Sequence, residues 1–278
     1  MTEKGLTSRL LICSGRWLSN LQTMASRVRQ HGEYLLLPLA LLLFLGMWEW
    51  IVWLGGYPPF ILPSPRGVYA KLVTVLSNGL LWSHARVTIT EILGGLALGL
   101  SMAIVLGYLM AKSRLLERFV SLYVVASQSV PIVALAPLLI IWFGPGKLSK
   151  VLVCALTLFF PMLVNTMVGI RSVNPDLVDL MRSLRATRWQ MFALLEVPSA
   201  LPTLFGGLKV SMTLSVIGAV VGEFVAADRG LGFLINVARG NFDTPLMFVA
   251  LLALVGIALL LYLSIVLLES VFAWRRQK

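Results

Sequence analysis

Charged residues are scarce in this sequence. They make up 13% of its 278 residues, whereas hydrophobic residues make up 58%. Soluble domains contain roughly 25% charged and about 45–50% apolar residues, so this composition excludes an ordinary water-soluble fold. Several apolar runs reach the ~20 residues that a helix needs to cross about 30 Å of hydrocarbon. We therefore predict one membrane domain with short extensions.

Cysteine and histidine are also rare. The two cysteines are Cys13, in a basic N-terminal segment, and Cys154, inside an apolar run. This placement indicates no disulfide framework, and we expect two free thiols. The two histidines, His31 and His84, lie outside the predicted spans, and no set of nucleophile, acid and base or of metal ligands is visible. The sequence therefore disfavours a membrane-embedded enzyme, and we expect no cofactor in this chain.

A phosphate-binding loop is missing as well. A Walker A loop requires Gly, four residues and then Gly-Lys-Ser/Thr. The segment Gly144-Pro145-Gly146-Lys147-Leu148 lacks both the spacing and the hydroxyl.

A transporter working alone on a proton gradient would instead need acidic or histidine relays near the membrane midplane. The glutamates lie nearer the ends of the apolar runs, which disfavours that class.

Basic residues are in excess, with 23 Lys and Arg and a formal net charge of +11. A nucleic-acid partner would be one explanation, but these residues cluster at the ends of apolar runs, where membrane orientation is decided. Fifteen lie on the N-terminal side of the membrane, in residues 1–34, 112–118 and 171–200 and after Val271. Seven lie on the other side: Arg66, Lys71, Arg86, Lys147, Lys150, Arg229 and Arg239. Lys209, near the start of the fifth predicted span, completes the total. Because positive charge marks the cytoplasm, we predict that both termini are cytoplasmic, and we expect no nucleic-acid partner.

The apolar runs predict an all-α integral membrane protein with about six transmembrane helices. They cover residues 35–55, 88–111, 119–143, 150–170, 203–225 and 246–269. Pro131 and Pro137 interrupt the third run, so we expect that span to be bent.

The remaining segments flank these spans. Residues 1–34 predict a basic amphipathic segment on the cytoplasmic membrane surface, with a disordered basic tail as the alternative. Residues 35–84 hold the first span and an extracytoplasmic stretch with a surface helix from about Val68 to Ser77. Residues 85–270 form the main transmembrane domain, and residues 271–278 form a cytoplasmic tail.

Four glutamates lie in or near the apolar runs, where ionisable groups usually mark a pathway or an ion pair. We expect Glu269 to pair with Arg275 and Arg276, Glu91 to snorkel or to pair with Arg86, and Glu49 to lie in an aromatic belt at the outer interface. Glu223, near the outer end of the fifth span, is a candidate for a translocation gate. Gln128 and Ser129, just before Pro131, are comparable pathway candidates, whereas four glycines more simply permit close helix packing: Gly94, Gly95, Gly99 and Gly107.

The longest predicted cytoplasmic connection, residues 171–202, has its own helix signals. Asn174 is a predicted N-cap with Pro175 at the first helical position, and this helix should run to about Leu184. Thr187 and Gln190 form a predicted capping box, so a second helix should begin at Arg188 and end before Pro198. Such a structured hairpin indicates a docking element for a soluble partner. An interfacial helix without a partner is the alternative.

The same hairpin resembles the cytoplasmic "EAA" loop of binding-protein-dependent ABC importer permeases. In that family the pattern is Glu-Ala-Ala, three residues, Gly-Ala-Ser and later Leu-Pro. This sequence departs from it: Asp179 replaces the glutamate, Leu180 and Met181 replace the two alanines, and Arg185 stands at the position of the glycine. A left-handed turn there would cost a non-glycine residue on the order of 1–2 kcal/mol. The residues that match in register are Asp179, Leu180, Met181, Arg185, Ala186, Thr187, Phe192, Val197 and Pro198.

The resemblance implies the type I ABC importer permease fold and a location in a bacterial inner membrane. It also implies several partners: two separate ATP-binding subunits that use ATP and Mg, an extracytoplasmic solute-binding protein, a second copy of this chain, and the lipid bilayer. We expect the coupling contacts to include Asp179, Leu180, Met181, Arg182, Arg185, Ala186, Thr187 and Pro198.

Three further phrases resemble the branch of this family that serves nitrate, sulfonates, taurine and vitamins or their precursors. They are Ile61 to Pro65, Pro137 to Gly144 and Gly222 to Leu234, the last reading GEFVAADRGLGFL. We favour a vitamin or precursor, such as riboflavin or a thiamine pyrimidine, as the solute. A sulfonate, taurine or nitrate is the alternative.

Overall fold

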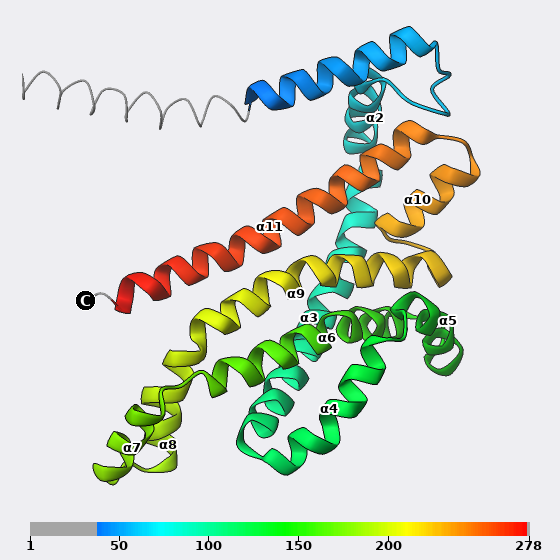
Figure 1. Ribbon diagram of the computed structural model, residues 1–278. Coiled ribbons are helices and arrows are strands. Elements are labelled where there is room, and N and C mark those ends of the chain that lie inside the picture. Colours follow the sequence, from blue (N-terminus) through cyan, green and yellow to red (C-terminus); the bar gives the residue numbers. More distant parts are fainter. Residues whose placement is uncertain (1–37, 277–278) are drawn as a thin grey trace, which may run out of the picture. The chain divides into compact units, whose positions relative to one another are not determined.

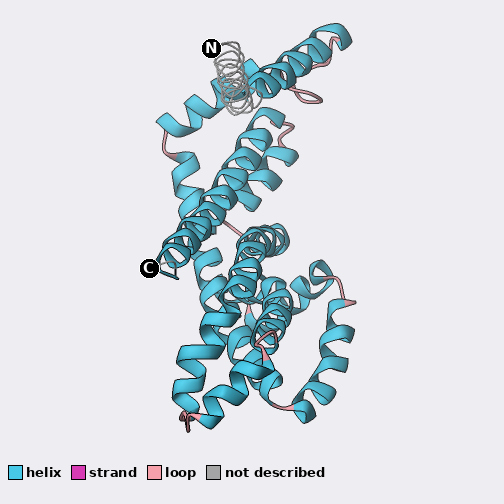
Figure 2. Ribbon diagram, turned by 60° about the vertical axis from the view of Figure 1, so that its left-hand side comes forward, coloured by secondary structure: helices cyan, strands magenta, loops and turns pink. Residues whose placement is uncertain are grey.

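The protein is seen in a computed structural model that describes residues 38–276, in which every regular element is a helix (Figure 2). The predicted amphipathic segment 1–34 lies outside the described residues. The chain divides into two compact units, residues 1–67 and 68–278, and each is described by itself. The all-α fold expected from the sequence is confirmed.

The first unit contains the helix Pro38–Gly55, whose 18 residues are apolar enough to cross a membrane. The chain turns at Gly56, which has a positive φ of 56° that glycine adopts without strain. Glu49 lies 3.8 Å from Arg66 in an exposed ion pair. Helix α2 (Pro65–Ser77) begins on a proline and continues into the second unit, which confirms the predicted surface helix with a start three residues earlier.

The second unit is built on long helices. Helices α3 (Leu80–Lys112), α6 (Lys147–Arg171), α9 (Val197–Ala226) and α11 (Thr244–Arg276) each have at least the ~20 residues required to span a bilayer. Helix α3 starts eight residues before the predicted span, since helix geometry extends beyond the hydrocarbon boundary. In Figure 1, α6 and α9 lie side by side, and they pack extensively on each other and on α3.

Close approach between α3 and α6 depends on glycine. A Cβ atom at Gly95 would lie 2.3 Å from the Cys154 Sγ, and one at Gly99 would lie 2.8 Å from the Ala155 carbonyl oxygen. Neither distance is compatible with a side chain. The prediction that these glycines permit close helix packing is therefore confirmed.

The predicted third span, 119–143, is two helices instead of one bent helix. Helix α4 (Arg114–Gln128) ends before Pro131, and α5 (Ile132–Phe143) begins after it. Pro131 has no backbone N–H to continue the helix, and its extended ψ of 123° turns the chain. Pro137 is accommodated within α5, whose 12 residues rise only about 18 Å. Five described helices are each long and apolar enough to cross a membrane, and α4 with α5 takes the place of the sixth predicted span.

The loops of the second unit lie at two ends of its long helices (Figure 1). We call the end with residues 171–202 the hairpin end and the end with α10 (Leu231–Gly240) the α10 end. At the hairpin end, Arg171 at the end of α6 pairs with Glu117 of α4 and donates to the Met110 carbonyl at 3.1 Å. At the α10 end, Lys71 of α2 pairs with Asp243 beside α10. The loops at each end come from segments that the charge count assigns to one side of the membrane. Figure 1 shows α7 and α8 near one end of α9 and α10 near the other.

Candidate functional site

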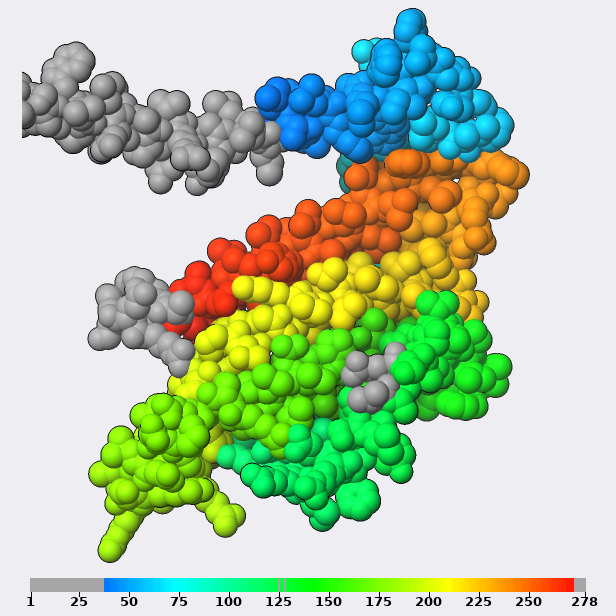
Figure 3. Space-filling model, viewed as in Figure 1, coloured from blue at the N-terminus to red at the C-terminus, as the bar shows by residue number. Residues whose placement is uncertain are grey.

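The connection 171–202 begins with helix α7 (Pro175–Ser183), as the sequence predicts. The Asn174 side chain accepts a hydrogen bond from the Asp176 N–H at 2.9 Å, and Pro175 occupies the first turn. No residue of α7 is buried, and Asp179 and Arg182 form an exposed ion pair at 3.2 Å. In Figure 3 this region projects beyond the packed helices.

Arg185 has a φ of 54°, so it occupies the left-handed region expected for the family's glycine. The Ala186 N–H donates to the Met181 carbonyl at 3.0 Å, and the Arg185 N–H donates to the Arg182 carbonyl at 2.9 Å. These two bonds form the Schellman motif that ends many helices. The turn is therefore retained, although the non-glycine residue costs about 1–2 kcal/mol.

Thr187 caps helix α8 (Arg188–Met191), which confirms the capping box. The Gln190 N–H donates to the Thr187 Oγ1 at 3.2 Å, and the Thr187 N–H donates to the Gln190 Oε1 at 2.8 Å. The predicted end before Pro198 is wrong, because a π-helical turn, η1 (Phe192–Glu196), joins α8 directly to α9. In this turn the Val197 N–H donates to the Phe192 carbonyl, five residues back, and the wider turn accommodates a proline that has no N–H to donate.

Apolar side chains are exposed on this hairpin. Leu177, Leu180 and Leu184 are 44%, 54% and 69% exposed, and Met181 beside them is half-buried. At helical spacing Leu177, Leu180 and Met181 lie on one face of α7, and Leu184, its C-cap residue, follows on the same side. An apolar face outside the packed helices is typical of a protein contact.

Glu196 joins the hairpin to α3. Its side chain is 6% exposed, it forms an ion pair with Lys112, and the Tyr108 hydroxyl donates to it at 3.2 Å. The Tyr108 ring also meets Phe192 edge-on at 5.3 Å. Sequence reasoning missed this contact, although an acidic residue between Leu195 and the apolar start of α9 is a signal that could have found it.

At the α10 end, Glu223 is 1% exposed and its carboxylate accepts hydrogen bonds at the start of α10. The Thr88 hydroxyl donates to it at 2.6 Å, and so does the Gly232 N–H. Thr88 in turn accepts a bond from the Leu231 N–H at 2.8 Å. A carboxylate at a helix N-terminus is favourable because the free N–H groups and the helix dipole are positive there.

Two glycines make room for this carboxylate. A Cβ atom at Gly230, where φ is 123°, would lie 2.3 Å from the Glu223 Cδ, and one at Gly232 would lie 2.8 Å from its Oε2. Two glycines of the phrase GEFVAADRGLGFL, Gly230 and Gly232, therefore leave the space that the Glu223 carboxylate occupies. His84 contributes from α3, where its Nδ1 accepts a bond from the Gly230 N–H at 3.1 Å.

The other two gate candidates lie on another part of the chain, at the end of α4 and in the break before α5. The hydrogen bonds of Glu223 come from α3 and α10, whereas Gln128 is the last residue of α4. Ser129 is exposed in the break between α4 and α5.

Glu91 has a different partner from the one expected. It is fully buried and lies 3.7 Å from the Lys150 Nζ, so the predicted pairing with Arg86 is wrong. Neither oxygen of the Glu91 carboxylate has a hydrogen-bond partner among the described residues. The structure also pairs Glu269 with Lys209 at 2.5 Å. The side chains of Arg275 and Arg276 lie outside the described part of the chain, so the pairing expected for them stays a prediction. Lys150 and Lys209 lie on neighbouring helices, and helix packing brought them to these acids.

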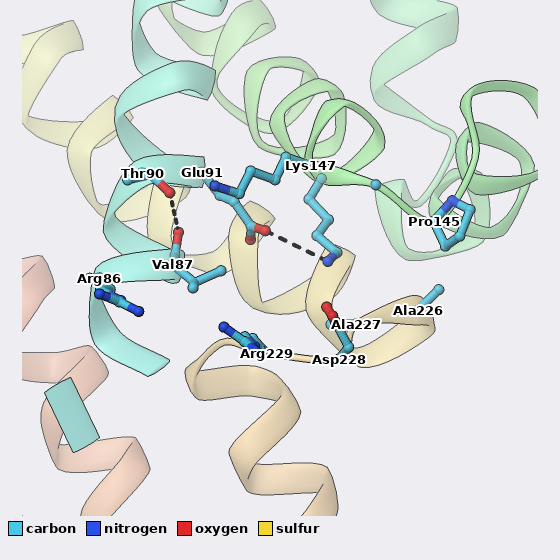
Figure 4. Close-up of a pocket in the computed structure, with 12 residues that line it drawn as sticks. Arg86, Val87, Thr90, Glu91, Pro145, Lys147, Ala226, Ala227, Asp228 and Arg229 are labelled. Atoms are coloured by element: carbon cyan, nitrogen blue, oxygen red, sulfur yellow. Dashed lines mark hydrogen bonds and ion pairs between the residues drawn. The ribbon is translucent and has the colours of Figure 1, made fainter. Parts of the chain in front are cut away.

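Glu91 and Lys150 contribute to a cavity of about 920 Å³ at the α10 end (Figure 4). The cavity lies between the start of α3, the start of α6 and the loop after α9. Its lining is Arg86, Val87, Thr90, Glu91, Pro145, Gly146, Lys147, Lys150, Ala226, Ala227, Asp228 and Arg229.

Residues 95–277 match the family described as binding-protein-dependent transport system inner membrane component. The chain belongs to this family. It is therefore a multi-pass permease subunit of an ABC importer, and the resemblance found in the hairpin is confirmed at the level of the family.

Several curated permeases are similar to this one. The riboflavin transport system permease protein RibX of Chloroflexus aurantiacus is 51% identical, over 84% of this chain and 87% of the relative. The formylaminopyrimidine transport permease protein ThiX of Halalkalibacterium halodurans is 37% identical, over 85% and 94%. The taurine transport system permease protein TauC of Escherichia coli is 30% identical, over 81% and 84%.

The crystal structure of an amino acid ABC transporter with histidines has the same fold. It superposes with a TM-score of 0.56 at 20% identity and covers 73% of this permease and 97% of that chain. At this identity the likeness supports the fold alone.

Membership of this family implies that the permease works with an ATPase and a solute-binding protein. Among the described residues of the permease, no group of three or more His, Cys, Asp and Glu side chains could hold a metal ion.

Proposed function

We propose that this permease imports a vitamin or a vitamin precursor, with riboflavin as the first candidate and a thiamine pyrimidine as the second. The observation that carries the proposal is the 51% identity with the riboflavin permease over 84% of the chain. The 37% identity with the formylaminopyrimidine permease supports the same class of solute. A sulfonate, taurine or nitrate is the alternative, since the sulfonate and taurine permeases are 30% identical.

An uptake experiment tests the solute. The permease is expressed with its ATPase and binding protein in a bacterium that requires riboflavin and cannot take it up. We expect growth on low riboflavin and uptake of labelled riboflavin that stops when the ATPase cannot hydrolyse ATP. Uptake of taurine that excess riboflavin does not reduce would contradict the proposal.

The hairpin is the proposed contact with the ATPase. Its exposed leucines need cover from water, and the apolar face of a helix suits a groove on a soluble subunit. Two copies of the permease would present two hairpins to an ATPase dimer, since closed twofold symmetry is the commonest arrangement of identical subunits. ATP and Mg would be bound by the ATPase. Its closure would draw the hairpins together, and α9, which is continuous with the hairpin through η1, would move with them.

The proposed orientation places both termini and the hairpin in the cytoplasm and the α10 end outside. It follows from the fifteen-to-seven distribution of Lys and Arg. Single cysteines placed at residues 20, 185 and 277 should resist a membrane-impermeant thiol reagent in intact cells. Single cysteines at residues 147 and 241, where the native side chains are exposed, should react. Labelling of residue 185 from outside would overturn both the orientation and the docking role of the hairpin.

A further inference from the structure

Positive charge gathers at one place on the α10 end. Of the seven Lys and Arg predicted on this side, Arg66 pairs with Glu49 and Lys71 pairs with Asp243. Four others line the cavity of about 920 Å³: Arg86, Lys147, Lys150 and Arg229. Basic residues are disfavoured on the outer side of membrane proteins. Their convergence on one cavity therefore calls for a local reason.

These charges are not balanced within the cavity. Its four basic and two acidic side chains leave a net charge of +2. Glu91 and Lys150 pair with each other, so Arg86, Lys147 and Arg229 face Asp228 alone. All three cations are exposed, and in the described part of the chain none of them forms an ion pair. The mouth of the cavity can therefore receive an anion.

The buried wall offers the opposite chemistry. Glu91 is 0% exposed, and its two carboxylate oxygens accept no hydrogen bond from any described residue. A buried acceptor without a donor is costly, so this carboxylate favours a ligand that brings an N–H or O–H group. Figure 4 shows the Glu91 carboxylate beside the basic groups of the cavity.

The remaining lining leaves space. Gly146, Ala226 and Ala227 have no side chain beyond a Cβ, and Val87 and Pro145 are compact. Sites for small organic molecules typically have volumes of about 300–1,000 Å³. The cavity is thus large enough for one such molecule.

We propose that this cavity binds a small organic solute that carries an anionic group, contacted by Arg86, Lys147 and Arg229, and a hydrogen-bond donor that reaches Glu91. The inference rests on the proposed function, in which the α10 end faces the side from which solute arrives. It adds a solute site in the permease itself and predicts that, among flavins, one that carries a phosphate group is preferred over riboflavin, which has no anionic group.

The test uses the complete permease and ATPase complex in lipid nanodiscs, with riboflavin and riboflavin 5′-phosphate as fluorescent probes and taurine as a displacing anion. We expect the phosphate ester to bind more tightly than riboflavin, and added salt to reduce that preference. Arg86→Gln, Lys147→Gln and Arg229→Gln should each weaken its binding about tenfold, because hydrogen bonds to charged groups contribute roughly 1.5–3 kcal/mol. The replaced residues are exposed, so folding should be retained.

Arg239→Gln is the matched control, since Arg239 is an exposed cation of the same end that does not line the cavity. It should leave binding unchanged. Equal binding of the two flavins, no saturable binding of any probe, or equal effects of all four substitutions would overturn the proposal. So would an effect of the cavity variants only on the affinity for the binding protein, which would mean that the occupant is an acidic protein surface.

Failure of this inference is distinguishable from failure of the proposed function. Undiminished binding of riboflavin 5′-phosphate by the Arg86→Gln, Lys147→Gln and Arg229→Gln triple variant, together with normal riboflavin uptake, would leave vitamin import standing and remove the cavity site. Displacement of the phosphate ester by taurine, with no riboflavin uptake by the native importer, would keep the site and remove riboflavin as the solute.

Discussion

The two ends of the second unit hold their charges in different ways. At the α10 end, Glu91, Lys150 and Glu223 are at most 3% exposed and lie between packed helices. At the hairpin end the side chains of Arg171 and Glu117 are 35% and 29% exposed, and Lys112, whose side chain is 43% exposed, pairs with the buried Glu196. A buried pair is hard to separate, because one stranded charge costs several kcal/mol. Partly exposed pairs exchange with water at little cost. The buried pair of Glu91 and Lys150 at the α10 end should therefore resist separation, whereas the pair of Arg171 and Glu117 at the hairpin end can separate at lower cost.

The largest effect should follow from breaking the buried pair. Lys150→Met leaves Glu91 buried without its partner, which should destabilise the permease by about 3–5 kcal/mol. Thermal unfolding of the purified complex measures this loss. The double variant Glu91→Leu with Lys150→Met removes both charges and should recover most of the stability. If Lys150→Met alone is as stable as the native permease, the α10 end is not the more rigid of the two.

The next effect concerns the exposed face of the hairpin. Met181→Asp places a charge in the proposed apolar contact with the ATPase, and an unpaired buried charge costs several kcal/mol. We expect uptake to fail and the ATPase to dissociate, while the permease still inserts in the membrane. Co-purification of the ATPase measures the contact. Met181→Leu, which keeps an uncharged apolar side chain of similar size at the same position, is the matched control and should retain the ATPase.

The hairpin shows how far local sequence signals reach. Asn174, Pro175, Thr187 and Gln190 act on backbone groups a few residues away, so the two helix starts were predictable. The prediction that the second helix ends before Pro198 was wrong because the η1 turn accommodates this proline. No local sequence pattern indicates a π-helical turn.

The candidate site at the α10 end could be predicted only in part. Glu223 was recognised from its place in an apolar run and its family-like phrase. Its partners were not, because Thr88 and Gly232 meet it only when three helices pack. Sequence neighbours suggested Arg86 for Glu91, yet burial removes Glu91 from that exposed residue and leaves it with Lys150. Ion partners inside a helical membrane protein follow from packing, which proximity in the sequence does not encode.

A moderate effect is expected at Glu223. Glu223→Gln keeps the shape of the side chain and removes its charge, so the bonds from Thr88 and Gly232 lose the roughly twofold strength of charge-assisted hydrogen bonds. The loss should be on the order of 1 kcal/mol. We expect assembly with the ATPase to persist, while uptake or the stimulation of ATP hydrolysis by the binding protein falls. Unchanged uptake and stimulation would make Glu223 a structural residue without a part in the gate.

The smallest effect should come from the partly exposed pair of Glu117 and Arg171. The hydrogen bond from Arg171 lowers the pKa of Glu117 below its ordinary value of 4.5. A carboxyl group with a lowered pKa stabilises the folded state above its ordinary pKa, and this contribution is lost as the pH falls through the lowered value. At neutral pH, Glu117→Gln should leave ATPase binding intact and change uptake little, because solvent screens an exposed pair. Thermal unfolding of the variant and the native permease, compared from pH 7 to pH 3, should give curves that converge as the pH drops. At neutral pH, Glu117→Gln could instead lose as much stability as Lys150→Met. The hairpin end would then be held as firmly as the α10 end, and the contrast between the two ends would not explain which of them moves.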